Sequence, residues 1–275
     1  MSNLWFYENQ TPNLEFCTRV KETLYTEKTP FQELAILNTH EFGRTLVLDG
    51  AIQTTIRDEF IYHEMITHVP LFTHPEPKEV LVIGGGDGGT IREVLKHKEV
   101  EKARLVEIDR RVVELSRQYL PEISCGLDDP RVEILYEDGI KHLKEARDKY
   151  DVILVDSPDP VGPAVGLFTR EFYQSVYDAL KEDGLFVAQT ESPFFNQDII
   201  PGIFKNIKSI FPITRMYLAF VPTYPGGIWS FTLGSKDYDP LSTLTQKTPI
   251  PTRYYTSRLH RAAFVLPRYV EELLE

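Results

Sequence analysis

Val80-Leu-Val-Ile-Gly-Gly-Gly-Asp-Gly-Gly-Thr90 is the stretch that decides the fold, because an apolar strand runs into a glycine loop and then into a helix-like segment. Glycines let a backbone approach a ligand closely, and the amides at the start of the next helix carry partial positive charge. The junction therefore predicts a nucleoside-binding site. Asp87 is unusual in such a loop, since the pyrophosphate of a dinucleotide would have to lie against its carboxylate. We expect a cationic or neutral ligand instead.

Downstream of the glycine loop, apolar strand-like runs alternate with amphipathic helix-like runs. We predict strands at 79–83, 103–108, 131–135, 151–155 and 185–189, and helices at 90–98, 110–120, 140–147, 170–181 and 199–210. This alternation is typical of an α/β fold with a parallel sheet covered on both faces by helices. Two further runs, 214–221 and 228–233, predict an antiparallel pair that closes the sheet.

The N-terminal part of the chain has a different pattern. Strand-like runs at 15–25, 31–38, 44–48 and 51–56 follow one another, and Asp49-Gly50 marks a tight turn between the last two. We therefore expect a small antiparallel β-domain over residues 1–57 and a Rossmann-like α/β domain with a mixed sheet over 58–275. The exposed strand edges of the N-terminal β-domain predict a homodimer or a homotetramer. Trp5, Phe6 and Tyr7 either pack in a strand or interface core, or wall a channel.

Segment 58–72, where the second domain begins, has helical spacing. The spacing predicts one buried stripe on this helix, formed by Phe60, Ile61, Met65, Ile66 and Val69.

The charge balance limits the partners of the protein. The 275 residues include 41 acids and 30 bases, so the formal net charge is −11. This excess disfavours nucleic acid and anionic membranes and favours cationic ligands. Cys17 and Cys125 are too few for a disulfide framework and lack metal-ligand spacing, so we expect a cytoplasmic protein without a metal. We expect neither a secretory leader nor a membrane span, because the N-terminus lacks a basic region followed by an apolar core and no apolar run is of membrane-spanning length.

Acidic residues follow each of the first four predicted strands of the α/β domain. Because the carboxyl ends of parallel strands meet at one crevice, we expect these acids to line a single pocket. Glu107 follows the second strand, where nucleoside-binding folds have an acid that accepts both ribose hydroxyls. Asp138-Gly139 either reads the edge of an adenine or is a turn and helix cap. The acids are Asp87, Glu107 with Asp109, Asp138, and Asp156 with Asp159.

Taken in order, these motifs resemble those of the spermidine synthases, the polyamine aminopropyltransferases, over nearly the whole chain. The resemblance implies a small β-domain followed by a methyltransferase-type α/β domain. It also implies transfer of the aminopropyl group of decarboxylated S-adenosylmethionine to putrescine, giving spermidine and 5'-methylthioadenosine. The motifs are Gly84-Gly-Gly-Asp87-Gly-Gly89, Val106-Glu107-Ile-Asp109, Tyr136-Glu-Asp138-Gly139, Asp156-Ser-Pro-Asp159, Tyr62-His63-Glu64 and Asp49-Gly50-Ala-Ile-Gln53.

The resemblance also implies roles for individual residues. Glu107 would hold the ribose, and Asp138 and Gly139 the adenine, with Gln32 and Pro163 completing the nucleoside site. Neither a metal nor a permanently bound cofactor is implied.

The same resemblance assigns the amine-binding side of the pocket. Asp87 and Asp159 would take the ammonium of the aminopropyl arm, and Asp156 would be the base. The other residues expected to contact the polyamine or line its pocket are Tyr62, His63, Ser157, Pro158, Gln53, Gln189 and Tyr224.

The chemistry gives an independent reason for the acids. Decarboxylated S-adenosylmethionine carries a sulfonium and an ammonium but no carboxylate, so Asp87 would attract it and repel ordinary S-adenosylmethionine. The attacking amine must lose a proton, which costs roughly 4 to 5 kcal/mol at pH 7 for an alkylamine. Carboxylates that bind the diamine raise this cost further.

Other functions fit parts of the pattern. A methyltransferase that acts on a small amine would share the α/β domain, but it must accommodate the carboxylate of its cofactor beside Asp87 and Asp159. A nicotinamide-dependent dehydrogenase is disfavoured by the acidic glycine loop. A polyamine or nucleoside sensor would keep the binding acids and need no base. Spermidine or cadaverine could replace putrescine as the acceptor.

Overall fold

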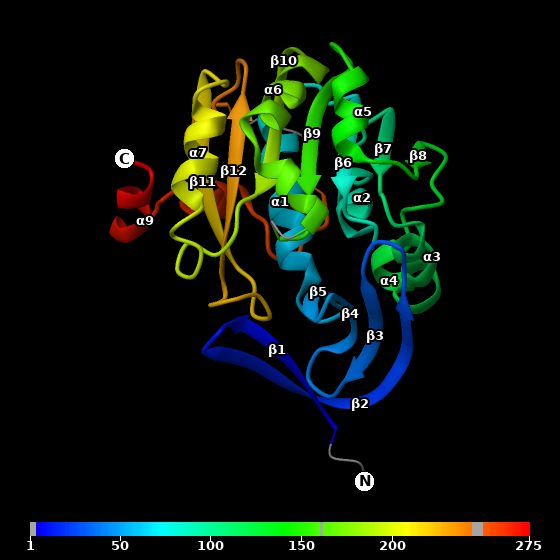
Figure 1. Cartoon of the computed structure of the whole chain (residues 1–275). Coiled ribbons are helices and arrows are strands. Elements are labelled where there is room, and N and C mark those ends of the chain that lie inside the picture. Colours follow the sequence, from blue (N-terminus) through cyan, green and yellow to red (C-terminus); the bar gives the residue numbers. More distant parts are fainter. Residues whose placement is uncertain (1–3, 160–161, 244–249) are drawn as a thin grey trace.

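The computed structural model describes residues 4–159, 162–243 and 250–275 (Figure 1). An N-terminal antiparallel sheet, drawn in blue at the bottom of Figure 1, has the strand order β1-β2-β3-β4-β5. The predicted N-terminal β-domain is thereby confirmed. Its strands are β1 (Trp5–Thr11), β2 (Leu14–Lys28), β3 (Glu33–Thr39), β4 (Gly43–Leu48) and β5 (Ala51–Thr55).

Strand β1 was not among the predicted strands. Trp5 and Tyr7 are exposed on it, and Phe6 packs against a small cluster that includes Val20 and Leu37. The three N-terminal aromatics therefore belong to a strand and do not wall the cavity described below.

The second sheet is mixed, as predicted, and has the order β11-β12-β10-β9-β6-β7-β8. Its five strands from β10 to β8 pair in parallel, and β12 and β11 pair antiparallel at one edge. The strands are β6 (Glu79–Gly84), β7 (Lys102–Val106), β8 (Val132–Leu135), β9 (Tyr150–Asp156), β10 (Leu180–Gln189), β11 (Ile213–Phe220) and β12 (Ile228–Ser235).

Helices cover both faces of this sheet, because the side chains of each strand alternate between two apolar clusters. Val80 and Val82 of β6 pack with helices α1 and α2, whereas Leu81 and Ile83 pack with α5, α6 and α7. The helices are α1 (Glu59–Thr73), α2 (Gly89–Val94), α3 (Arg110–Tyr119), α4 (Pro121–Ser124), α5 (Gly139–Glu145), α6 (Arg170–Ala179), α7 (Ile200–Lys208), α8 (Ser257–Ala263), α9 (Arg268–Leu273) and the 3-10 helix η1 (Gly162–Phe168). The short helices α4, α8, α9 and η1 were not predicted.

The strand order reverses beside β6, and this reversal locates the site. From β6 the chain adds β7 and β8 on one side and then crosses to β9 and β10 on the other. Gly84, at the end of β6, is in register with Asp156, at the end of β9. Ligands of open α/β sheets bind at such a reversal, outside the carboxyl ends of the strands.

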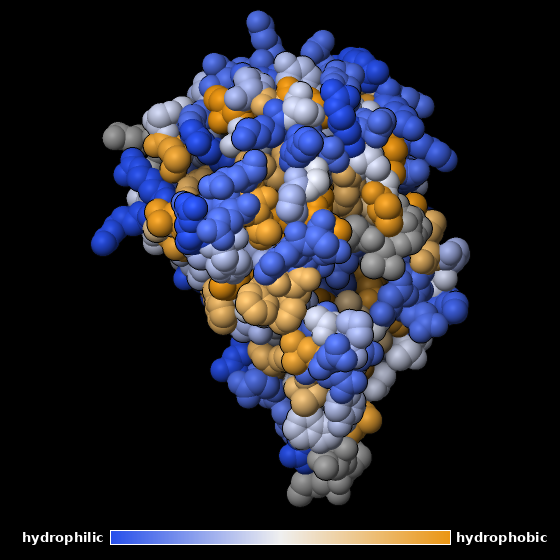
Figure 2. All heavy atoms as spheres, turned by 60° about the vertical axis from the view of Figure 1, so that its left-hand side comes forward, coloured by the Kyte–Doolittle hydropathy of each residue, from blue (hydrophilic) through white to orange (hydrophobic). Residues whose placement is uncertain are grey.

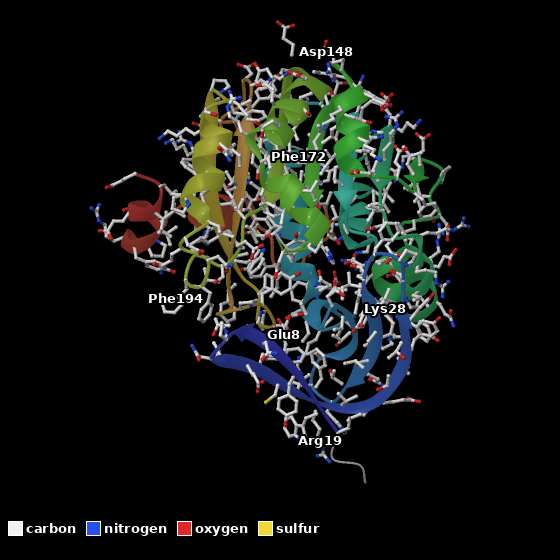
Figure 3. All side chains as sticks on the ribbon, viewed as in Figure 1. Glu8, Arg19, Lys28, Asp148, Phe172 and Phe194 are labelled. Carbon is white, nitrogen blue, oxygen red and sulfur yellow. The ribbon has the colours of Figure 1, made fainter. Side chains whose placement is uncertain are left out.

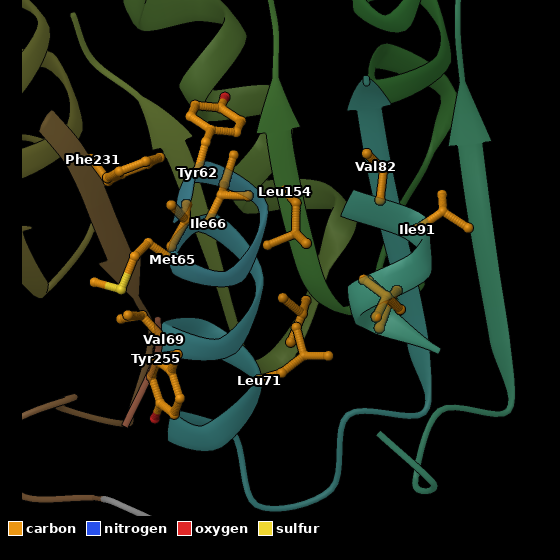
Figure 4. Close-up of a cluster of buried hydrophobic side chains, with 14 of the residues drawn as sticks. Tyr62, Met65, Ile66, Val69, Leu71, Val82, Ile91, Leu154, Phe231 and Tyr255 are labelled. Atoms are coloured by element: carbon orange, nitrogen blue, oxygen red, sulfur yellow. The ribbon is translucent and has the colours of Figure 1, made fainter. Parts of the chain in front are cut away.

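Helix α1 differs from its predicted amphipathic form, since 14 of its 15 residues are buried. Figure 4 shows its apolar side chains within the core, with Phe231 and Leu154 nearby. The polar Glu64 is buried as well, and its carboxylate accepts hydrogen bonds from the backbone amides of Arg253, Tyr254 and Tyr255 at 2.7–2.8 Å. These bonds satisfy the buried charge and attach the C-terminal segment to α1.

Hydrophilic side chains predominate over the broad upper part of the face in Figure 2. Among the described residues, the structure contains no helix of the length and apolar character that crossing a bilayer would require.

Candidate functional site

A cavity of about 360 Å³ lies between the N-terminal sheet and the carboxyl ends of the strands of the second sheet. Almost all predicted site residues meet there. Asp109 does not line the cavity, and the side chain of Pro163 is outside the described part of the chain. The predicted residues that line the cavity are Gln32, Gln53, Tyr62, His63, Asp87, Glu107, Asp138, Gly139, Asp156, Ser157, Pro158, Asp159, Gln189 and Tyr224.

The glycine loop follows a path that side chains would block. Gly84 and Gly85 have left-handed backbone angles, with φ of 76° and 68°. A Cβ atom at Gly84 would lie 2.2 Å from the carbonyl oxygen of Asp156, and one at Gly85 would lie 2.5 Å from its carboxylate. The glycines therefore allow the loop to pass directly beside Asp156.

Glu107 is a buried acid that directly follows β7. Its carboxylate accepts a hydrogen bond from the amide of Asp109 at 2.9 Å. Burial raises the pKa of Glu107 to about 7, although backbone hydrogen bonds oppose this.

The expectation that Asp109 lines the pocket was wrong. Its carboxylate caps α3 through the amide of Arg111 and accepts hydrogen bonds from Thr29 and Gln32 at 2.8 and 2.9 Å. Asp109 thus joins the β2–β3 connection to the second sheet. Because the side-chain nitrogen of Gln32 donates to Asp109, its carbonyl oxygen remains for a ligand.

Asp138 is a helix cap, and it also lies at the cavity. It caps α5, since one carboxylate oxygen accepts a hydrogen bond from the amide of Ile140 at 2.8 Å. Gly139 is tightly placed, because a Cβ atom there would lie 2.6 Å from Ile83.

Asp156 is held by two hydroxyl donors at the end of β9. Tyr62 donates to one carboxylate oxygen at 2.8 Å, and Thr90 donates to the other at 2.6 Å. Withdrawal of the carboxyl group from solvent and repulsion from Asp87 raise the pKa of Asp156. The hydrogen bond from Thr90 could not be predicted, because threonine is common at helix starts and nothing in the sequence sets this one apart.

His63 lies between two carboxylates. Its Nδ1 is 2.6 Å from Glu59, and its Nε2 is 3.4 Å from Asp87. Burial alone would lower the pKa of His63, but attraction to Asp87 and Glu59 raises it to about 10. Burial would likewise raise the pKa of Asp87, yet the imidazolium of His63 and the amide of Gly89 lower it.

Two further buried acids were missed in the sequence: Glu8 lines the cavity, and Glu191 lies behind the lining residue Asp159. Glu8 of β1 lines the cavity (Figure 3), and burial raises its pKa to about 7. Glu191, which is buried, lies beside Asp159, and burial together with repulsion from Asp159 raises its pKa to about 8. Gln189 donates to Glu191 at 3.1 Å and to the carbonyl oxygen of Ser157 at 3.2 Å. Glu191 has a left-handed backbone angle, with φ of 72°, and no sequence pattern predicted it.

An aromatic pair closes the cavity near the N-terminal sheet. The rings of Tyr62 and Tyr224 lie 5.6 Å apart, and the hydroxyl of Tyr224 donates to the carbonyl oxygen of Gln53 at 2.7 Å. Asp58, just before α1, accepts hydrogen bonds from the amide and hydroxyl of Thr223. These contacts attach the loop that carries Tyr224 to the junction between the two sheets.

One group of potential metal ligands was found among the described residues, outside the cavity. The ligand atoms of His74, Asp151 and Asp183 lie within 4.8 Å of one another. Lys181 pairs with Asp151 at 2.9 Å, and the amide of Glu76 donates to Nδ1 of His74. This Nδ1 bond places the proton of a neutral ring on Nε2, the atom that faces Asp183 at 3.8 Å, so that nitrogen then has no lone pair for a metal.

Two family models cover most of the chain. One, described as a spermine/spermidine synthase domain, matches residues 59–246, and another, a spermidine synthase tetramerisation domain, matches residues 4–55. The chain belongs to the spermine/spermidine synthase family. The resemblance found in the motifs is thereby confirmed.

Individual relatives agree with the family models. The chain is 64% identical over 273 residues to a polyamine aminopropyltransferase of Caldicellulosiruptor saccharolyticus, covering 99% of this chain and 98% of the relative. It is 60% identical over 276 residues to one of Moorella thermoacetica, covering 100% and 98%.

Solved structures of spermidine synthases share the fold. One, in complex with the transition state analogue AdoDATO, has a TM-score of 0.97 and 45% identity and is covered to 96% by the whole of this chain. Another, from Thermotoga maritima, has a TM-score of 0.96 and 45% identity and is covered to 95%.

The contact between Gly89 and His63 gives a first prediction. A Cβ atom at Gly89 would lie 2.2 Å from Cε1 of His63, so Gly89→Ala must displace the imidazole from between its carboxylates. We expect a loss of about 1–3 kcal/mol in the free energy of unfolding, measured with urea. Gly202→Ala in α7 is the matched control, because nothing lies within 4 Å of its added methyl group. Equal stabilities of the two variants would contradict the packing described here.

Proposed function

We propose that the chain transfers the aminopropyl group of decarboxylated S-adenosylmethionine to putrescine, giving spermidine and 5'-methylthioadenosine. One observation carries the proposal: Asp87, Asp156 and Asp159 line a single cavity that also contains the buried acid Glu107. A doubly cationic donor and a diamine are suited to such a lining. The similarity to polyamine aminopropyltransferases over the whole chain supports the same reaction.

The nucleoside of the donor occupies the end of the cavity formed by the glycine loop and β7. Glu107 accepts the ribose hydroxyls there, and Asp138 and Gly139 contact the adenine. The carbonyl oxygen of Gln32 accepts a further hydrogen bond, since its amide nitrogen is held by Asp109. Pro163 completes this end of the site.

The ammonium of the aminopropyl arm lies between Asp87 and Asp159. Ordinary S-adenosylmethionine would place its carboxylate at the same point, where like charges repel. This repulsion also disfavours the alternative of a small-amine methyltransferase. The loop residues Ser157 and Pro158 set the position of Asp159, and Gln189 holds that loop through the carbonyl oxygen of Ser157.

Putrescine lies beside Tyr62, Tyr224 and Gln53. Its methylene chain packs against the two tyrosine rings, and its distal ammonium is drawn toward Glu8 and Glu191, the two acids that the sequence did not reveal. His63 lines this part of the cavity, but both of its ring nitrogens already face carboxylates. It therefore acts through Asp87, the carboxylate that holds the aminopropyl arm of the donor.

Asp156 is the catalytic base. The lone pair of the putrescine nitrogen attacks the methylene carbon next to the sulfonium, so that a carbon–nitrogen bond forms as the carbon–sulfur bond breaks. The sulfur leaves as the neutral thioether of 5'-methylthioadenosine, and the proton of the amine passes to Asp156. A carboxylate with a raised pKa is a better base than an ordinary one.

The remaining expectations are part of the same proposal. The chain divides at residue 57 into a β-domain and a catalytic domain, and it assembles through the β-domain into a homodimer or homotetramer. The match of residues 4–55 to a tetramerisation domain supports this, as does the exposure of Trp5, Tyr7 and Leu14. A cytoplasmic location is supported by Cys17 and Cys125, which are both exposed and unpaired.

An assay of 5'-methylthioadenosine tests the proposed reaction. We expect product from decarboxylated S-adenosylmethionine and putrescine, and a loss of roughly 10²- to 10⁴-fold in kcat/KM for Asp156→Asn, because the base is removed. Asp151→Asn is the matched control, since Asp151 is buried at the opposite end of the same strand. Absence of product with the unaltered enzyme would refute the assignment.

The conflict between binding and deprotonating the diamine predicts an alkaline optimum. The carboxylates that hold putrescine keep it protonated, so the fraction with a free lone pair rises with pH. We expect the turnover rate to increase from pH 7 to pH 9. A rate that falls over this range while circular dichroism shows the folded protein would contradict the prediction.

A further inference from the structure

The position of His63 raises the question of what holds its charge. The ring lines the cavity, but its side chain is only 2% exposed, and a carboxylate stands at each nitrogen. A neutral imidazole has only one N–H, so it could not donate to both Glu59 and Asp87. The two contacts together therefore require an imidazolium, which offers a proton to each carboxylate.

Glu59 is itself fixed from outside the cavity. The guanidinium of Arg92 in α2 donates to both of its carboxylate oxygens, at 3.1 and 2.8 Å. Arg92 also donates to Glu93 at 2.9 Å, and Glu93 in turn pairs with His68. Neither Glu59 nor Arg92 is among the described residues that line the cavity. A continuous chain of charges thus runs from helix α2 to Asp87.

We propose that Glu59 is a positioning residue that, through the protonated ring of His63, keeps Asp87 and Asp156 ionised at the same time. The proposal rests on the proposed role of Asp156 as the base. It assigns to Glu59 and Arg92 a function in the reaction although neither reaches the substrates.

The physical reason is the repulsion between two carboxylates in one site. When two such groups are close and shielded from water, one of them tends to keep a proton. Asp156 receives hydrogen bonds from Tyr62 and Thr90, and Asp87 receives one from the amide of Gly89, but these donors carry no net charge. The imidazolium is the nearby cation that offsets both carboxylates, and it lowers the pKa of each.

Removal of the Glu59 charge should therefore change the protonation of Asp156, the proposed base. In Glu59→Gln, the ring of His63 loses one of its two carboxylate partners and releases its proton at a lower pH. Asp87 and Asp156 then share a proton near neutrality. We expect kcat/KM at pH 7 to fall by roughly tenfold for each unit by which the pKa of the base comes to exceed 7. The deficit should become smaller as the pH is raised to 9, because the base is ionised again.

Two comparisons separate this effect from a loss of structure. Glu93→Gln removes a buried carboxylate from the same chain of charges without touching His63, so any loss of rate should be equal at pH 7 and pH 9. In a His63→Gln background, which has no titrating ring, the added Glu59→Gln change should produce no further shift of the pH profile. A Glu59→Gln deficit that is the same at both pH values would overturn the proposal.

A titration of the His63 ring by NMR tests the proposal without turnover. In the ligand-free protein we expect the ring signal, assigned by its loss in His63→Gln, to stay that of an imidazolium up to about pH 10. In Glu59→Gln the midpoint should fall, and Glu59→Asp should restore part of the shift. A midpoint near 6.5 in the unaltered protein, or one unchanged by Glu59→Gln, would overturn the proposal. Absence of turnover would instead overturn the proposed function.

Discussion

The repulsion among carboxylates at the ends of β6 and β9 is the constraint on which the rest of the structure depends. Asp87 and Asp156 face the same cavity and both are withdrawn from solvent, an arrangement that costs free energy unless nearby charges or hydrogen bonds offset it. The imidazolium of His63 and the hydroxyls of Tyr62 and Thr90 provide this compensation. The remaining negative field attracts the cationic substrates.

The fold places these groups by a few specific features. Helix α1 passes through the core, so Tyr62 and His63 are held on a rigid element that carries them to the ends of β6 and β9. The reversal of strand order at β6 brings the glycine loop beside Asp156. The N-terminal sheet covers the opening and adds Gln32, Gln53 and Glu8 to the lining. The site is therefore complete only where the two sheets meet.

Much of this site could be predicted, because its main acids come at the ends of parallel strands. Asp87, Glu107, Asp138, Asp156 and Asp159 each follow an apolar run, and the α/β pattern predicts where the ends of such runs meet. The same rule failed for Asp109, since it cannot tell an acid that faces the crevice from one that caps the next helix. Both positions favour aspartate for local reasons.

Other residues left no signal in the sequence. Glu8 lies on a strand that was not predicted, and Glu191 depends on a turn with a left-handed backbone. Glu59 has the ordinary appearance of an acid in the first turn of a helix, where it complements the helix dipole. Its burial depends on α1 being enclosed on all sides, and hydrophobic periodicity cannot reveal that for a helix with polar residues throughout. The position of Gln53 in the lining was predicted only through the family resemblance.

The central claim is that the carboxylates select a donor that lacks a carboxylate of its own. Calorimetric titration of the protein with decarboxylated and with ordinary S-adenosylmethionine, under identical salt and pH, measures this directly. Like charges placed together in a closed site cost several kcal/mol, so we expect the decarboxylated form to bind at least about a hundredfold more tightly. Asp87→Asn should reduce the difference in affinity between the decarboxylated and the ordinary compound. Equal affinities of the unaltered protein for the two compounds would contradict the account.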